Sequence, residues 1–405
     1  MAAPRQPFRD REGTVEVFGR HVNPGKAKLY RDVEMDVVMG RRVGVRFYDA
    51  FEDHSWINCH CNGGVFNLGH RHPAVVGAVR EALVRLDIGN HHLISGHRAR
   101  LAERLVATTD GELTGVVFGV GGGEAIDLAL KVCRWATGRT EIVSALGGYH
   151  GHTGLAMAAG DAQYRDPFGP QPPGFDQVPF DDLDALSGVI GDDTAAVILE
   201  PIPATLGMPI PSEGYLPGVE ALCRERGAKL IMDEVQTGLG RTGKLWCYQH
   251  DDLRPDVVVT GKGLSGGVYP IAATLMTEEL LALFEAEPFI HISTFGGAEP
   301  GCAAALTVLD LIETPGFLER VNEVSDRLAT ELSGLPFELR RKGLMMGLKL
   351  PVDGAAMALT QMLFLQGIYA VYANNDRSVL QLLPPLIISD EEVDEVIAIL
   401  KRVFS

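Results

Sequence analysis

The sequence predicts an α/β protein with one large, mostly parallel sheet and a smaller α+β domain built from the two ends of the chain. Between about residue 66 and residue 300, short apolar strand candidates alternate with amphipathic helix candidates. This alternation is typical of a mostly parallel sheet covered by helices on both faces. Residues 1–60 and 305–405 do not alternate in this way. We therefore expect 61–304 to form the large domain and the two terminal segments to form the small one.

Length and charge limit the classes of protein that fit. The chain has 405 residues, of which 46% are hydrophobic and 22% charged, which describes about two globular domains. Its 36 basic and 53 acidic residues give a formal charge of -17, which argues against nucleic-acid and anionic-membrane partners. Neither an N-terminal signal segment nor an apolar run of about 20 residues is present, so we expect a cytoplasmic protein.

The elements of the large domain follow one another in a regular order. The strand candidates are TGVVFGV (114–120), EIVSA (141–145), AAVILEP (195–201), AKLIMDE (228–234) and DVVVTG (256–261). A helix candidate, EAIDLALKVCRWATG, follows the first strand, and the Pro/Gly-rich segment 166–179 is predicted to be an exposed loop. The C-terminal part contains a helix candidate from Ala303, a strand at GLMMGLKL, the segment VYANNDRSVLQLLPPLII and a closing helix.

The six cysteines do not form a disulfide framework or a metal motif. They are scattered along the chain, mostly in segments predicted to be buried, and are expected to be reduced thiols. One group has enough ligands for zinc: His54, Cys59, His60, Cys61, His70 and His72. Its spacing matches no zinc motif, and strand alternation would place Cys59 and Cys61 on the face opposite His60. We therefore expect no metal site.

Ligands of α/β sheets gather beyond the carboxyl ends of the strands, so the residues that follow each strand carry the functional prediction. Gly121, Gly122 and Gly123 follow the first strand and open a helix, whose free N–H groups and positive dipole end suit a phosphate. A plain tight turn is the alternative. Tyr149, flanked by glycines, follows the second strand and would let a flat ligand approach the backbone.

Two charged residues follow the most apolar strands. Asp233 ends AKLIMD, where it is either a helix cap or the counter-charge of a bound group. Lys262 follows DVVVTG, where burial would lower its pKa and favour the free amine that attacks carbonyls. The alternative is an ordinary turn lysine on the surface. A phosphate cradle, a carboxylate, an amine and an aromatic platform at one edge of a sheet are the parts that hold pyridoxal phosphate, which binds as a lysine Schiff base.

The chain resembles the class III, or omega, aminotransferases of the fold-type-I pyridoxal phosphate enzymes over nearly its whole length. The matching motifs occur in family order: FNLGHRHPAVVGAV, GGGEAIDLALKVCR, GGYHGHTGLA, ILEPIPATLGMPIP, LIMDEVQTGLGRTG, VVVTGKGLSGGVYPIAA, STFGGAEPGCAAAL and RRKGLMMGLKL. The resemblance implies a PLP-transferase-type large domain and a homodimer with shared active sites. It also implies small-molecule substrates: an amine or amino acid, and a keto acid.

The resemblance also implies a role for particular positions. Lys262 would form the Schiff base and then act as the general base, and Asp233 would pair with the ring nitrogen of the coenzyme. The other positions that would contact the coenzyme are Gly121, Gly122, Gly123, Tyr149, His150, Glu200, Val235, Gln236 and, from the neighbouring subunit, Thr294.

The sequence departs from its relatives at positions that concern the substrate. Family members that act on ornithine-like amino acids carry an arginine where this chain has Gln381, and a glutamate where it has Thr205. Losing both together avoids a stranded buried charge, which indicates a repurposed pocket. Arg377 could reach a substrate carboxylate or be solvated. His91 and His92 could line the pocket or have a structural role.

The function predicted from these residues is amino transfer through a lysine Schiff base and a pyridoxamine intermediate. The missing arginine leaves open a lyase, decarboxylase, racemase or carbon–carbon bond-forming enzyme on the same scaffold, because one carbanion can react in several ways. A non-catalytic coenzyme-binding protein is a further alternative, which the presence of both Lys262 and Asp233 disfavours.

Overall fold

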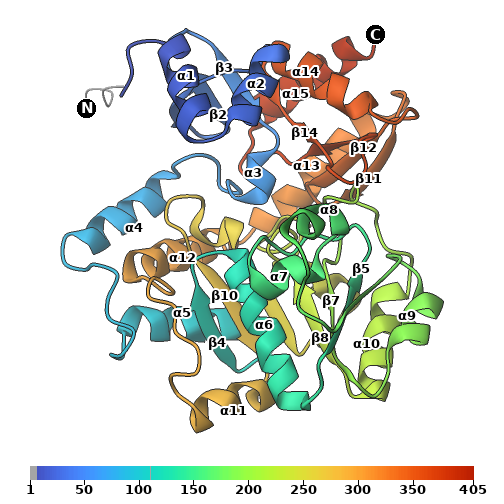
Figure 1. Ribbon diagram of the computed structural model, residues 1–405. Helices are drawn as coiled ribbons and strands as arrows, with labels where there is room; N and C mark the ends of the chain where they lie inside the picture. Colours follow the sequence, from blue (N-terminus) through green and yellow to red (C-terminus); the bar gives the residue numbers. More distant parts are fainter. Residues whose placement is uncertain (1–6, 110) are drawn as a thin grey trace.

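The computed structural model describes residues 7–109 and 111–405. A seven-stranded sheet forms the lower part of the molecule in Figure 1, and the N-terminal (blue) and C-terminal (red) segments together form the part above it. The strands of this sheet, in spatial order, are β4 (Gly115–Gly119), β10 (Ala272–Met276), β9 (Val257–Thr260), β8 (Lys229–Asp233), β7 (Thr194–Leu199), β5 (Glu141–Ala145) and β6 (Phe175–Val178). The pairs from β9 to β6 are parallel, and β10 runs antiparallel to both of its neighbours. The predicted mostly parallel sheet is therefore confirmed.

Helices cover both faces of this sheet, which explains why its strands are apolar without interruption. In β7, Val197 and Leu199 pack into a cluster on one face, whereas Ala196 and Ile198 pack into a cluster on the other. The helices of this part are α4 (Pro73–Leu83), α5 (Gly96–Ala107), α6 (Gly122–Thr137), α7 (Gly154–Ala159), α8 (Ala162–Arg165), α9 (Leu183–Val189), α10 (Tyr215–Arg226), α11 (Glu278–Ala286) and α12 (Glu299–Ile312). Three short 3-10 helices are also present: η1 (Asp166–Phe168), η2 (Cys247–Asp251) and η3 (Lys262–Ser265).

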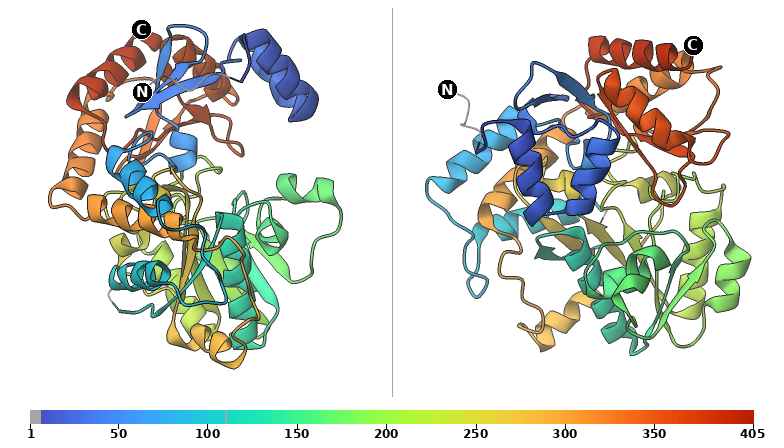
Figure 2. Two further views of the ribbon diagram at one scale, coloured as in Figure 1. Left: turned by 90° about the vertical axis from the view of Figure 1, so that its left-hand side faces the viewer. Right: turned by 45° about the horizontal axis from the view of Figure 1, so that its top comes forward.

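The upper part in Figure 1 combines residues from both ends of the chain. One four-stranded sheet contains β1 (Met39–Val43), β2 (Arg46–Asp49), β3 (Ser55–Asn58) and β13 (Ile368–Tyr369). Another contains β11 (Glu338–Lys342), β12 (Met345–Lys349), β15 (Val379–Leu382) and β14 (Val371–Tyr372). The helices are α1 (Arg11–His21), α2 (Pro24–Asp32), α3 (Cys61–Gly64), α13 (Phe317–Glu331), α14 (Ala355–Leu365) and α15 (Asp390–Val403). Figure 2 shows α1 and α2 beside each other at the edge of this part.

A second hydrophobic cluster joins the two ends. Val45, Ile57 and Cys59 from the N-terminal segment pack with residues of α13, α14, α15, β12 and β15. This cluster supports the predicted two-part organisation, and the domain bounds 1–60, 61–304 and 305–405 stay a prediction. The bound at 304 and 305 falls inside α12.

Some local predictions were wrong. Segment 166–179 contains η1 and the edge strand β6 and is not a continuous loop, because Phe175–Val178 pairs with β5 despite the prolines before it. The helix expected from Ala303 begins at Glu299, since Pro300 occupies the first turn, where no N–H is needed. Strand alternation does not extend to Cys59 and Cys61, because β3 ends at Asn58.

All six cysteines are free and buried, as predicted for space-filling thiols. Within the described residues, no three His, Cys, Asp or Glu side chains come together as metal ligands. Over the same residues, no single helix is long and apolar enough to cross a membrane. The pair α12 and α13, bent by 68° relative to each other, has together the length and composition of a membrane span.

Candidate active site

Lys262 lies at the carboxyl end of the buried strand β9, at the centre of the candidate site. Gly261 turns the chain into η3, and Lys262 has a φ of 39°, which is unusual for a residue with a side chain. Its Nζ donates a 2.7 Å hydrogen bond to Oε1 of Gln236. Burial lowers the pKa of Lys262, and the charges of Asp233 and Glu200 oppose that effect only in part. The structure therefore holds this amine in a form that loses its proton more easily than a surface lysine.

Asp233 ends the neighbouring strand β8 and is nearly buried. Its Oδ1 accepts a hydrogen bond of 3.1 Å from the N–H of Val235, and its Oδ2 lies 2.8 Å from Nδ1 of His150. Burial alone would lower the pKa of His150, but the hydrogen bond to Asp233 and the charges of Asp233 and Glu200 raise it. Because a carboxylate only accepts, Nδ1 is the donor in this pair. The hydrogen bond from His150 thus fixes the position of Oδ2 of Asp233.

Three glycines open α6 next to β4. Gly121 is the N-cap and contributes no side-chain capping bond. A Cβ on Gly122 would lie 3.1 Å from Cγ1 of Val235, and a Cβ on Gly123 would lie 2.7 Å from Oγ1 of Thr153. Side chains at these two positions would crowd their neighbours, so glycine keeps the backbone N–H groups of the helix start accessible. The 16-residue α6 also brings its positive dipole end to this point.

Tyr149 and Glu200 come from the ends of β5 and β7. The N–H of Tyr149 donates a 2.9 Å hydrogen bond to Oε1 of Glu200, which orients the turn that carries the ring. The ring of Tyr149 makes edge contacts with His152 at 5.2 Å and Tyr164 at 5.3 Å between centroids. Burial raises the pKa of Glu200 to about 7. These contacts hold the Tyr149 ring in one orientation close to the strand ends.

The predicted substrate positions Thr205 and Gln381 are both held by neutral hydrogen bonds. Oγ1 of Thr205 donates to the carbonyl of Gly147 at 3.1 Å. Gln381 is buried in β15, where its Nε2 donates to the carbonyl of Tyr372 at 3.4 Å. The Arg377 side chain is exposed. Positions 377 and 381 therefore do not provide a buried arginine that could bind a substrate carboxylate.

The remaining predicted residues lie away from Lys262. His91 lines a cavity together with Phe118 and Phe289. The ring centroids of His92 and Phe289 lie 5.2 Å apart. Thr294 is exposed in the segment between α11 and α12. The structure thus groups His91 and His92 with residues 288–296 and leaves Thr294 exposed.

Sequence reasoning missed residues that the fold brings to Lys262 from the N-terminal segment. His60 is half-buried, and its pKa is lowered to about 4 by desolvation and then by the charge of Lys262. A Cβ on Gly63 would lie 3.3 Å from Nζ of Lys262. The positive φ of Asn62 and Gly63 marks a tight turn there. The paired glycines Gly63 and Gly64 were the available sequence signal.

A sheet whose strand ends carry an amine of lowered pKa, a buried carboxylate and a glycine-opened helix defines a coenzyme-dependent enzyme of the aminotransferase fold. The sequence matches the family Aminotransferase class-III over residues 29–404, and the chain belongs to that family. It is 53% identical over 386 residues to an uncharacterized aminotransferase of Archaeoglobus fulgidus, covering 94% of this chain and 91% of that protein.

Solved structures agree with this assignment. The ornithine aminotransferase of Toxoplasma gondii ME49 superposes with a TM-score of 0.89 at 26% identity and covers 98% of this chain and 96% of its own. A further structure of the Toxoplasma gondii enzyme has a TM-score of 0.84 at 27% identity, covers 98% of each chain and is described with partial occupancy of PLP at the active site. The chain is an aminotransferase, and its coenzyme is pyridoxal 5'-phosphate.

The residues present fit this coenzyme. The glycine-opened end of α6 has no side-chain cap, as a phosphate site requires. Nε2 of Gln236 and Nε2 of His150 are buried and have no hydrogen-bond partner within the described chain. Such orphaned buried groups are costly unless a ligand or water satisfies them. The amine, the carboxylate and the helix end therefore form a set that a phosphate-bearing pyridine aldehyde can complete.

Proposed function

We propose that this chain moves an amino group from an amine or amino acid to a keto acid, with Lys262 holding the coenzyme as a Schiff base. The observation that supports this most strongly is the lowered pKa of the half-buried Lys262, which lies at the strand edge that also carries Asp233 and the start of α6. Pyridoxal phosphate, when bound, supplies an aldehyde that condenses with amines and a ring that accepts electrons from the substrate carbon.

Each residue has a proposed task in that reaction. Lys262 moves a proton to and from the substrate carbon, a task that its lowered pKa favours. Asp233 keeps the ring nitrogen protonated, and His150 positions Asp233 through the 2.8 Å contact. The backbone N–H groups of Gly122 and Gly123 bind the phosphate. Val235 and Tyr149 would contact the ring, and Gln236 would bond the ring hydroxyl.

A homodimer with shared sites is part of this proposal. Thr294 is exposed, and the same segment exposes Phe289 by 61%, Ile290 by 59% and Phe295 by 58%. An apolar patch of this kind is typical of a surface that contacts a second chain. In that arrangement Thr294 would reach the coenzyme phosphate of the partner subunit.

The test is the visible absorption spectrum of the coenzyme-loaded protein, recorded with a panel of amines and amino acids added one at a time. Amino transfer predicts conversion to the pyridoxamine form and release of a carbonyl product. Product formation with return of the starting spectrum would contradict amino transfer. It would favour the lyase, decarboxylase, racemase or carbon–carbon bond-forming alternative, for which the neutral Thr205 and Gln381 are the supporting observation.

A further inference from the structure

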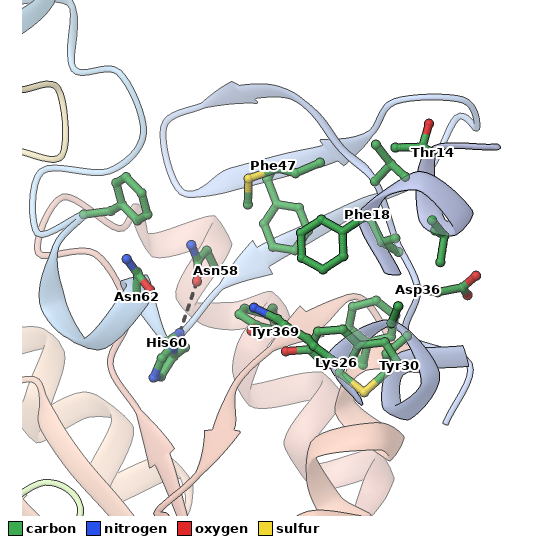
Figure 3. Close-up of a pocket in the computed structure, with 18 residues that line it drawn as sticks. Thr14, Phe18, Lys26, Tyr30, Asp36, Phe47, Asn58, His60, Asn62 and Tyr369 are labelled. Atoms are coloured by element: carbon green, nitrogen blue, oxygen red, sulfur yellow. Dashed lines mark hydrogen bonds between the residues drawn. The ribbon is translucent and has the colours of Figure 1, made fainter. Parts of the chain in front are cut away.

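A cavity of about 550 Å3 lies between the helices α1 and α2 and the sheet that contains β2 and β13. This volume is in the range of small-molecule pockets. Its walls include aromatic side chains: Phe18 from α1, Tyr30 from α2, Phe47 from β2, Phe364 from α14 and Tyr369 from β13. Figure 3 shows Phe47 and Tyr369 between the side formed by α1 and α2 and the side formed by Asn58, His60 and Asn62. The cavity is therefore suited to an apolar group.

Lys262 itself does not line this cavity, but two residues of the turn that carries Gly63 do. His60 and Asn62 both line the cavity, and Gly63 follows them directly. A Cβ on Gly63 would be 3.3 Å from Nζ of Lys262 and 3.4 Å from Oε1 of Gln236, so any side chain at this position would stand at the amine. Glycine is also suited to the φ of +67° at this turn. Residue 63 thus leaves unfilled the space next to the amine of Lys262.

The charged side chains around the cavity do not form a binding site for a carboxylate on the side chain of a ligand. Among the described residues that line it, the permanently charged side chains are Lys26 and Asp36, one of each sign. Lys26 is exposed and lies 5.7 Å from the ring centroid of Tyr30, and Asp36 is half-buried. Figure 3 shows both on the side opposite His60 and Asn62. The part of a ligand closest to Lys262 would meet neutral groups.

We propose that this cavity receives the side chain of the amino donor, and that the donor is a primary amine or amino acid with a large, uncharged, apolar group such as a phenylalkyl chain. In this proposal Gly63 is a specificity-determining residue, because it opens the cavity to the amine of Lys262. The inference rests on the proposed amino transfer and adds the substrate class.

The experiment compares 4-phenylbutylamine with propylamine as donors for the coenzyme-loaded protein, and measures the binding of 4-phenylbutanol, which has no amino group. We expect kcat/KM to be at least roughly tenfold higher for 4-phenylbutylamine, since each buried methylene contributes about that factor in an apolar pocket. Thr14→Trp, on the cavity side of α1, should reduce this ratio roughly tenfold and weaken binding of the alcohol. The matched control is Glu12→Trp, an exposed position on the same helix outside the cavity lining, which should leave both unchanged.

A second variant, Phe18→Ala, tests the same assignment if Thr14→Trp does not fold. Phe18→Ala removes an aromatic wall at a position that is 36% exposed, and it should lower the same ratio. Equal kcat/KM for the two amines, or ratios that neither variant changes, would overturn the assignment of the cavity while amino transfer stands. Binding of the alcohol that Thr14→Trp weakens, without any amino transfer, would support the cavity and refute the proposed reaction instead.

Discussion

The glycine-opened start of α6 gives a prediction whose magnitude follows from geometry. The change is Gly123→Ala, which would place a Cβ 2.7 Å from Oγ1 of Thr153. Relief to an ordinary contact of about 3.4 Å requires a displacement of about 0.7 Å. A shift of that size lengthens a charge-assisted hydrogen bond of about 2.8 Å to the limit of bonding. Losing one such bond costs about 1.5–3 kcal/mol, so the dissociation constant of pyridoxal phosphate should rise roughly 10- to 150-fold.

The assay is titration of the apoprotein with pyridoxal phosphate, followed by absorbance. Gly121→Ala is the comparison, because a Cβ on Gly121 would have no neighbour within 4 Å. We expect its dissociation constant to stay close to that of the unmodified chain. Adding Thr153→Ala to Gly123→Ala removes the conflict, so the double variant should bind like Thr153→Ala alone. Equal affinity for Gly123→Ala and Gly121→Ala would refute the assignment of the phosphate to this helix end.

Three more predictions concern buried groups. Lys262→Ala should remove the covalent coenzyme absorbance and reduce turnover by roughly 10²–10⁴ or more, with an unchanged far-UV circular dichroism spectrum; normal turnover would remove Lys262 from its role. Asp233→Ala should still bind coenzyme but lose most activity in steady-state assays, and a near-normal rate would contradict its pairing with the ring nitrogen. Burial raises the pKa of Glu234 to about 7 from 4.5, so the folded state holds this proton more tightly than the unfolded state. Glu234 should therefore contribute a fall in stability of roughly 3 kcal/mol as pH rises from 4.5 through 7. Glu234→Gln should remove that contribution in urea unfolding while the contribution of Glu200 remains, and an unchanged pH dependence would refute the prediction.

Much of the large sheet could be predicted from the sequence, because its strands are short, apolar and separated by helices. Five of the strands, β4, β5, β7, β8 and β9, overlap the predicted segments. The edge strand β6 was missed because prolines and glycines precede it, and composition does not show that β5 offers it a partner. The strand β10 was not predicted either, since its antiparallel pairing with β4 joins segments far apart in the chain.

In the candidate site, too, some features could be predicted from the sequence and others could not. Lys262, Asp233 and the three glycines follow strands, so a rule about strand ends finds them. The pairing of His150 with Asp233 joins residues 83 positions apart, and no periodicity encodes it. The cavity depends on the packing of α1 and α2 over β2 and β13, which brings together the two ends of the chain. Such tertiary features require the structure.

The neutral contacts of Thr205 and Gln381 bear on how the chain selects a donor. A buried arginine at position 381 without a carboxylate at position 205 would leave an unpaired charge, which costs several kcal/mol. Here Gln381 bonds a backbone carbonyl, and Thr205 and Asn375 both donate to the carbonyl of Gly147, at 3.1 Å and 2.7 Å. These bonds satisfy both positions without charge. Since neither position supplies a cation, we infer that shape and apolar contact, which the cavity lined by His60 and Asn62 would provide, discriminate between donors more than charge does.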